Sequence, residues 1–182
     1  FPTRQDRERR ACFEVMFIDE AKIFVKAGGG GDGCSSRNRT IVNKIGTPDG
    51  GPGGDGGNVI FKADSNVHTL LDFQYRKHFK ADSGLNGSSN HKKGHWGSDL
   101  IVKVPAGTLI RDAYTSLVLR DLVKPGDSVI IARGGPGGRG NSKGRESLKG
   151  LPGEEKTLFL ELKLIADVGI ISYPNTEKST LI

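Results

Sequence analysis

The residues best suited to chemistry lie near the end of the sequence, in the loop of residues 172–179 (SYPNTEKS). A phosphate-binding loop, G-x-x-x-x-G-K-[ST], cradles phosphates with backbone N–H groups, places a lysine on them and offers a hydroxyl to Mg²⁺. Lys178 and Ser179 stand where this motif needs its lysine and hydroxyl, but Ser172 and Glu177 replace its two glycines. Because Glu177 adds a side chain and a negative charge beside a polyanion, we expect this chain alone to bind nucleotide poorly.

Basic residues form a second set that could bind a ligand. The chain carries a net charge of +6 and has a sequence pI of about 9.4, which favours a polyanionic partner. We expect the docking cations for RNA in three segments rich in glycine or polar residues, and they are Arg37, Arg39, Arg76, Lys77, Lys92, Lys93, Arg133, Arg139, Lys143 and Arg145. Loop tips with little bulk and several charges suit a phosphate-lined cleft. The alternative interpretation is a solvated basic surface.

Three glycine-rich blocks must position these cations, and they contain most of the chain's 27 glycines. The blocks are residues 28–33, 46–57 and 134–140. Such segments are poor helix formers, since each interior glycine costs about 1 kcal/mol in an α-helix. We predict extended polyproline-II chains that pack side by side, as in collagen, although we find no strict Gly-X-Y period in any block.

Short strands separated by turn residues make up most of the remaining sequence. Alternating or apolar runs predict strands at residues 21–27, 58–63, 75–79, 100–104, 108–111, 117–122, 128–132 and 157–163, and a helical turn within 66–73. Helical periodicity is almost absent. We therefore predict a mainly β fold in which a small antiparallel barrel or sandwich of about eight strands carries the glycine layer.

The two ends of the sequence differ from this central unit. Residues 166–171 (ADVGII) form a mostly apolar run, which is typical of a strand buried on both faces of an α/β sheet. We divide the chain into an extension at 1–15, a glycine-rich domain at 16–163 and the truncated start of an α/β domain at 164–182. The extension is interpreted either as a disordered or vector-derived segment before Met16, or as the remnant of an organellar transit peptide. Its acidic residues argue against the second interpretation.

Several other residue types suggest weaker hypotheses. Cys12 and Cys34 lie far apart without a CxxC motif, so both are predicted to be free thiols in a reducing compartment. No apolar run approaches the roughly 20 residues of a membrane span. Two further sets are predicted to be structural or loop residues rather than metal ligands: the histidines His78, His91 and His95, and the turn-fixing aspartates Asp32, Asp49 and Asp55. Trp96 could stack on a base or pack at the edge of the barrel.

An ordered set of motifs resembles the N-terminal glycine-rich domain of Obg-type GTPases. The motifs stand at residues 16–33 (MFIDEAKIFVKAGGGGDG), 51–61 (GPGGDGGNVIF), 68–73 (HTLLDF), 102–112 (VKVPAGTLIRD) and 132–141 (ARGGPGGRGN). Residues 160–170 (LELKLIADVGI) resemble the family's junction into its G domain. The resemblance implies polyproline-II helices on a small β-barrel, followed by a Ras-like G domain.

The same resemblance implies a function. It predicts a GTPase of large ribosomal subunit assembly whose glycine-rich domain docks on ribosomal RNA. The expected location is the cytoplasm, or a mitochondrial or chloroplast matrix if residues 1–15 are a targeting remnant. The family sequence G-F-P-N-A-G-K-S corresponds to residues 172–179, so Asn175, Lys178, Ser179 and Thr180 would lie at GTP, with Ser179 on Mg²⁺ in a complete G domain. Two alternatives stay open: a non-enzymatic module that binds RNA or protein, and a decayed copy with a stable fold and no activity.

Overall fold

The computed structural model describes residues 19–39, 41, 43–142 and 145–163. The strands of its two larger sheets are β1 Glu20–Lys26, β4 Val59–Asp64, β5 His78–Lys80, β6 Leu100–Pro105, β7 Thr108–Asp112, β8 Val118–Leu122, β9 Ser128–Ala132 and β10 Glu155–Leu162. A five-stranded sheet has the order β5-β1-β10-β7-β8, and a three-stranded sheet has the order β6-β4-β9. The mainly β prediction is therefore confirmed.

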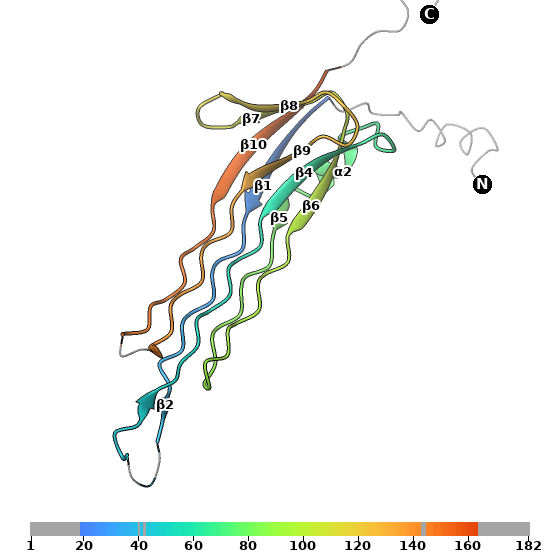
Figure 1. Ribbon diagram of the computed structural model, residues 1–182. Coiled ribbons are helices and arrows are strands. Elements are labelled where there is room, and N and C mark those ends of the chain that lie inside the picture. Colours follow the sequence, from blue (N-terminus) through green and yellow to red (C-terminus); the bar gives the residue numbers. More distant parts are fainter. Residues whose placement is uncertain (1–18, 40, 42, 143–144, 164–182) are drawn as a thin grey trace, which may run out of the picture.

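The predicted antiparallel barrel is wrong in two respects. Among the described strands, the two sheets stay separate, with β5 and β8 as the edges of one and β6 and β9 as the edges of the other. In addition, β1 pairs with β5 and β4 pairs with β6 in parallel. Parallel neighbours need a long connection rather than a tight turn. The glycine-rich segments supply that connection, because they carry the chain away from the sheets and back again (Figure 1).

The smaller elements also depart slightly from the prediction. The expected helical turn is the short helix α2 (Leu71–Tyr75), which buries Phe73 against the ring of Phe79 at 5.6 Å. A two-residue strand pair was not predicted: β2 (Arg37–Asn38) follows the first glycine block and pairs with β3 (Thr47–Pro48) at the start of the second. Within the described residues, no helix is long and apolar enough to cross a membrane.

The hydrophobic core lies between the two larger sheets. Strand β1 alternates exposed and buried residues along its whole length, which places Ile23 and Val25 inside. Phe61 of β4 and Leu158 of β10 meet them in the same cluster, and neither has exposed surface. Alternation of this kind buries one face of each strand against the other sheet and leaves the second face to solvent.

The glycine-rich segments continue the strands as a second part of the molecule, here called the glycine layer. Figure 1 shows its extended chains leaving the ends of the strands and running side by side. The layer consists of three pairs of segments, joined at their far ends: residues 27–34 with 50–58, 81–88 with 91–99, and 133–141 with 147–154.

Hydrogen bonds hold the glycine layer together with a repeat of three residues. Gly28, Gly31 and Cys34 donate their backbone N–H groups in turn to the carbonyls of Gly57, Gly54 and Gly51. The row Ala27, Gly30 and Gly33 donates instead to Glu154, Leu151 and Leu148. Three residues per turn is the repeat of a polyproline-II helix, which makes no hydrogen bonds within itself. Each segment therefore satisfies its backbone groups through its neighbours.

Close approach between segments explains the glycines. A Cβ on Gly31 would overlap the carbonyl of Leu85, and a Cβ on Gly54 would overlap that of His95. Residues 50–58 read GGPGGDGGN, so two glycines in every three closely approach neighbouring segments and the third position carries a side chain. The statement that no Gly-X-Y period runs through the blocks is therefore wrong for this segment, since its period is Gly-Gly-X.

The aspartates were predicted to fix local turns. For Asp32 and Asp55 this prediction is wrong, because the groups that their side chains bind are distant in sequence. The Asp32 carboxylate accepts a bond from the backbone N–H of Gly150 at 2.9 Å, and that of Asp55 accepts one from Gly137 at 2.7 Å. Both partners lie on other segments, far away in sequence. Both aspartates occupy the third position of the repeat. Their carboxylates accept the backbone N–H groups of Gly137 and Gly150 in place of a backbone carbonyl.

Candidate functional site

The nucleotide-binding residues of the prediction lie outside the described residues. Asn175, Lys178, Ser179 and Thr180 all fall within 164–182. Among the basic residues, Lys143 is also outside the described part of the chain. The candidate site therefore has to be built from the other nine cations, all of which are exposed.

The structure brings two predicted cations together at the far end of the glycine layer. Arg37 of β2 and Arg145, in the loop after residue 141, line one open pocket of about 520 Å³. Ser35, Pro48, Asn141, Glu146 and Ser147 complete its lining. Arg39 follows directly after β2 and is exposed. Guanidinium groups that converge from two loops are suited to bind phosphate by paired N–H donors.

A buried asparagine holds the two loops of this pocket together. Asn141 accepts the N–H of Gly50 on its side-chain oxygen at 2.8 Å and donates its side-chain N–H to the carbonyl of Ser36 at 2.9 Å. Its own backbone N–H donates to Cys34 at 3.0 Å. Asn141 is only 7% exposed, so these bonds are shielded from water. Asn141 therefore ties the end of the segment 133–141 to Gly50 and to residues 34–36, next to Arg37.

A buried aspartate connects the same end to a third loop. The Asp49 carboxylate accepts bonds from the Ser36 hydroxyl at 2.7 Å and from the backbone N–H of Asn90 at 3.1 Å. These bonds, followed by the nearby positive charge of His91, hold the pKa of Asp49 below its ordinary value of 3.8. Its backbone carbonyl also accepts the N–H of His91 at 2.7 Å. Asp49 thus ties the turn at residues 89–92 to the pocket end.

That turn presents two further predicted cations. Asn90 and His91 both have a φ of 57°, and the Lys92 N–H donates to the Ser89 carbonyl, as in a tight turn with two left-handed residues. Lys92 and Lys93 follow it on the outgoing segment and are exposed. The far end of the glycine layer therefore carries Arg37, Arg39, Lys92, Lys93 and Arg145; we call this set the cationic end.

The remaining predicted cations lie elsewhere. Arg139 is exposed along the segment 133–141, and Arg133 begins that segment beside Glu154, which accepts its backbone N–H at 3.2 Å. Arg76 and Lys77 lie between α2 and β5 in the sheet half, with the Arg76 guanidinium 5.1 Å from the ring centre of Phe79. The predicted docking residues therefore lie in three places. Five form the cationic end, Arg133 and Arg139 lie along the segment 133–141, and Arg76 and Lys77 lie in the sheet half.

The structure also bears on the predictions for Trp96, for the cysteines and for metal ligands. Trp96 is 69% exposed, with the Lys93 ammonium 4.8 Å from its ring centre, so it does not pack at a sheet edge. Cys34 is a free thiol, whereas Cys12 lies outside the described residues. In the described ranges, no group of three or more His, Cys, Asp or Glu side chains is placed to hold a metal.

Sequence reasoning missed the role of Asn141. One signal was available: Gly135 and Gly138 precede it at intervals of three, so Asn141 stands where the repeat expects a glycine. A polar residue that replaces a glycine in such a row needs a specific partner. Its bonds to Gly50 and Ser36 provide one.

The fold and the site together define a glycine-rich β domain whose far end presents fixed cations. Comparison with known proteins gives the family. The family model described as GTP1/OBG matches residues 18–164. Relatives called "GTPase Obg" are similar to this chain: that of Persephonella marina is 52% identical over an alignment of 176 residues, covering 92% of this chain and 52% of the relative. That of Ruminiclostridium cellulolyticum is 49% identical over 175 residues, covering 92% and 41%.

The chain belongs to the GTP1/OBG family, as the resemblance predicted. It spans about half the length, or less, of these curated relatives. The matched region contains all the described strands and the whole glycine layer.

Proposed function

We propose that the glycine-rich domain docks an Obg-type GTPase on ribosomal RNA of the large subunit during subunit assembly. The observation that carries the proposal is the cationic end: five exposed cations at the far end of a rod of hydrogen-bonded backbone. Asn141 and Asp49 hold Gly50, Ser36 and Asn90 together near these cations, which lowers the conformational freedom that the backbone there loses on binding. The names of the relatives support the GTPase part of the proposal.

The shape of the glycine layer supports RNA as the partner. Its segments run side by side without bulky side chains between them, and its hairpin tips project away from the sheets at different levels (Figure 1). Projecting tips that carry cations can enter a cleft lined by phosphates from several RNA strands. Phosphate contacts of this kind supply affinity that falls steeply as salt rises.

The nucleotide part of the proposal rests on the sequence alone. Lys178 and Ser179 would meet the phosphates and Mg²⁺ of GTP, with Asn175 and Thr180 beside them in a complete G domain. The donor set fits only in part, since Ser172 and Glu177 replace the glycines whose N–H groups would cradle phosphate. We therefore derive no hydrolytic step for this chain. In an Obg-type GTPase with a complete G domain, the GTP state would change the affinity for the subunit through linkage.

The docking proposal is tested by co-sedimentation with purified large ribosomal subunits across a salt series. The variant Arg37→Ala/Arg39→Ala/Arg145→Ala should bind more weakly. The slope of log affinity against log salt should fall by about 2, because each lost phosphate contact removes about 0.7 from it for single strands. The control Lys62→Ala/Arg120→Ala/Lys124→Ala removes the same charge from the sheet half and should bind as the parent chain does. Equal loss in both variants, or no binding at low salt, contradicts the proposal.

A second candidate function is a binding module without nucleotide activity, which Ser172 and Glu177 favour. Titration with a fluorescent GTP analogue and Mg²⁺ separates the two. Micromolar binding by this chain would contradict the module, and the variant Glu177→Gly should bind more tightly if the loop is only damaged at that position.

A further inference from the structure

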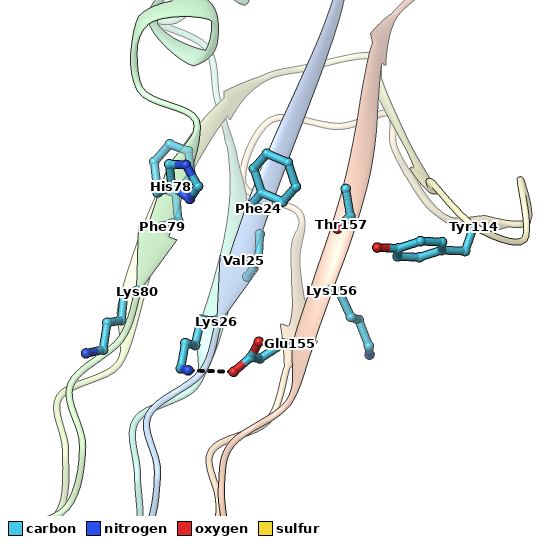
Figure 2. Close-up of a pocket in the computed structure, with 10 residues that line it drawn as sticks. All are labelled: Phe24, Val25, Lys26, His78, Phe79, Lys80, Tyr114, Glu155, Lys156 and Thr157. Carbon is cyan, nitrogen blue, oxygen red and sulfur yellow. Dashed lines mark ion pairs between the residues drawn. The ribbon is translucent and has the colours of Figure 1, made fainter.

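A second pocket lies in the sheet half, away from the cationic end. It has a volume of about 450 Å³ and opens on the outer face of the five-stranded sheet, between β5, β1, β10 and the turn after β7 (Figure 2). Its volume falls within the range of small-molecule sites, roughly 300–1,000 Å³. None of the docking residues predicted from the sequence lines it.

Aromatic side chains form two sides of this pocket. The rings of Phe24 and His78 lie parallel, with an interplanar angle of 14° and centroids 5.0 Å apart. Figure 2 shows Tyr114 on the other side, with Thr157 between it and Phe24. Phe24 is 39% exposed and Tyr114 85% exposed. Aromatic rings left in solvent on a sheet are suited to stacking on another flat ring.

The backbone that carries Tyr114 is fixed although its ring is free. Asp112 accepts the N–H of Tyr114 at 2.7 Å, and Ala113 donates its N–H to the carbonyl of Thr157 on β10 at 2.9 Å. Ser116, with a φ of 56°, closes the same turn by donating to the Asp112 carbonyl. The turn therefore holds Tyr114 beside β10 rather than letting it move away from the sheet.

Cations lie along one edge of the aromatic pocket. Lys26 and Lys80 are register partners on the neighbouring strands β1 and β5. Like charges on adjacent strands are unfavourable unless an anion lies between or beside them. Glu155 pairs with Lys26 at 2.5 Å, and among the described residues no ion-pair partner is found for Lys80. Lys80 is thus an exposed cation beside a ring stack.

We propose that this pocket binds one unpaired nucleotide of RNA, a proposal that rests on the RNA-docking function. The base stacks on the exposed ring of Tyr114, over Thr157 and beside Phe24, and the adjoining phosphate lies at Lys80. Stacking on aromatic side chains beside a positive charge is how sheets bind single-stranded nucleic acid irrespective of sequence. A peptide partner fits less well, since exposed aromatic rings beside a cation match the flat base and charged phosphate of a single nucleotide.

The first test measures binding of fluorescein-labelled hexauridylate by anisotropy at low salt. Tyr114→Ala should weaken binding about ten-fold, the scale expected for loss of one base stack. Lys80→Gln should weaken it less and reduce the salt slope by about 0.7. The matched control is Tyr75→Ala, because Tyr75 is 82% exposed on α2 and does not line the pocket. Unchanged affinity in Tyr114→Ala, or equal loss in Tyr75→Ala, overturns the proposal.

The second test locates the contact. Hexauridylate with one 4-thiouridine is photo-crosslinked to the chain and the modified peptides are identified by mass spectrometry. Crosslinks at Phe24 or Tyr114 support the pocket. Crosslinks confined to the cationic end overturn it while leaving the docking function intact. Uridine monophosphate that binds as tightly as hexauridylate overturns the assignment to RNA in favour of a free nucleotide.

Large ribosomal subunits distinguish this proposal from the docking function. One outcome would contradict the docking function: the parent chain does not bind subunits, while the triple arginine variant still binds hexauridylate through the pocket. The assignment of the pocket to ribosomal RNA would then fail as well, and the pocket would be a binding site for single strands only. If Tyr114→Ala loses subunit binding but no crosslink forms at the pocket, the occupant is a protein of the subunit and the nucleotide assignment is overturned.

Discussion

The sheet half of the molecule and its glycine layer are held together by different contacts. In the sheet half, apolar side chains such as Phe61 and Leu158 are removed from water between two sheets. In the glycine layer, backbone N–H and carbonyl groups of neighbouring segments bond to one another every third residue, with almost no side chains between them. The hydrophobic effect dominates the first region, whereas the second depends on satisfied backbone groups at very short range.

The two regions should therefore respond to substitution in opposite ways. Removing atoms from the sheet core leaves a cavity, while adding atoms to the glycine layer forces segments apart. The four predictions that follow test this contrast by the free energy of unfolding from urea denaturation. They run from the largest expected effect to the smallest.

Phe61→Ala should have the largest effect, because the ring has no exposed surface and lies at the centre of the core. We expect a loss of about 4 kcal/mol. The control is Phe159→Ala, since Phe159 is 40% exposed on the outer face beneath the Lys22 ammonium. That variant should lose less than about 1 kcal/mol, the scale of a surface contact with some cation–π attraction. Similar losses in both would show that the core is not where stability resides.

Gly30→Ala should come next, with a loss of about 3 kcal/mol. A Cβ at this position overlaps the carbonyl of Pro136, which is backbone and cannot rotate aside. The adjacent residue provides a matched control, because a Cβ on Gly29 would meet its nearest atom at 3.8 Å. Gly29→Ala should stay within about 0.5 kcal/mol of the parent chain. If the two neighbours behave alike, close approach is not the reason for the glycines.

Asp55→Ala should have a moderate effect, since it removes the only side-chain acceptor that the structure gives to the N–H of Gly137. We expect a loss of about 1 kcal/mol, because both groups are close to solvent and water can replace the carboxylate. Asp55→Asn keeps an oxygen acceptor and should recover most of that loss. A conservative variant as damaging as alanine would mean that charge, rather than the bond to Gly137, is what matters.

The smallest effect should appear in the acid range. The pKa of Asp49 is held below its ordinary value of 3.8, so its ionised form stabilises the folded chain. That contribution is fully present above pH 3.8 and is lost as the pH falls through the lowered pKa of the folded state. Asp49→Asn should thus be less stable than the parent chain at pH 7, with the difference shrinking as the pH falls below 3.8. A difference that is constant between pH 7 and pH 3 would contradict this assignment.

The strands could be predicted from the sequence, and their arrangement could not. Alternation of Ile23 and Val25 with Lys22, Phe24 and Lys26 is a local property of the chain, and it identified β1 to within one residue. The parallel pairing of β1 with β5 depends on where the intervening glycine segments lead the chain. No window of sequence contains that information, which is why an antiparallel barrel or sandwich was predicted and the parallel pairs were missed.

The residues of the candidate site could be predicted from the sequence, but not which of them lie close together in the fold. Glycine-rich surroundings singled out Arg37 and Arg145, but only the pairing of distant segments brings them to one pocket. The same cause explains why Asp32 and Asp55 were expected to fix local turns: their partners Gly150 and Gly137 lie on other segments. Phe24 and Tyr114 were not predicted as site residues, since only the folded chain shows which aromatic rings lie together in solvent.

The strands continue directly into the glycine layer, and this limits which insertions or deletions its segments can accept. An insertion of one residue in the segment 50–58 would turn the following glycines away from their neighbours and break every bond beyond it. Only whole units of three residues, added together in the segments that face one another, keep all rows in register. Each unit adds roughly 9 Å at about 3.1 Å per residue. The distance between the sheets and the cationic end can therefore change only in steps of one polyproline-II turn.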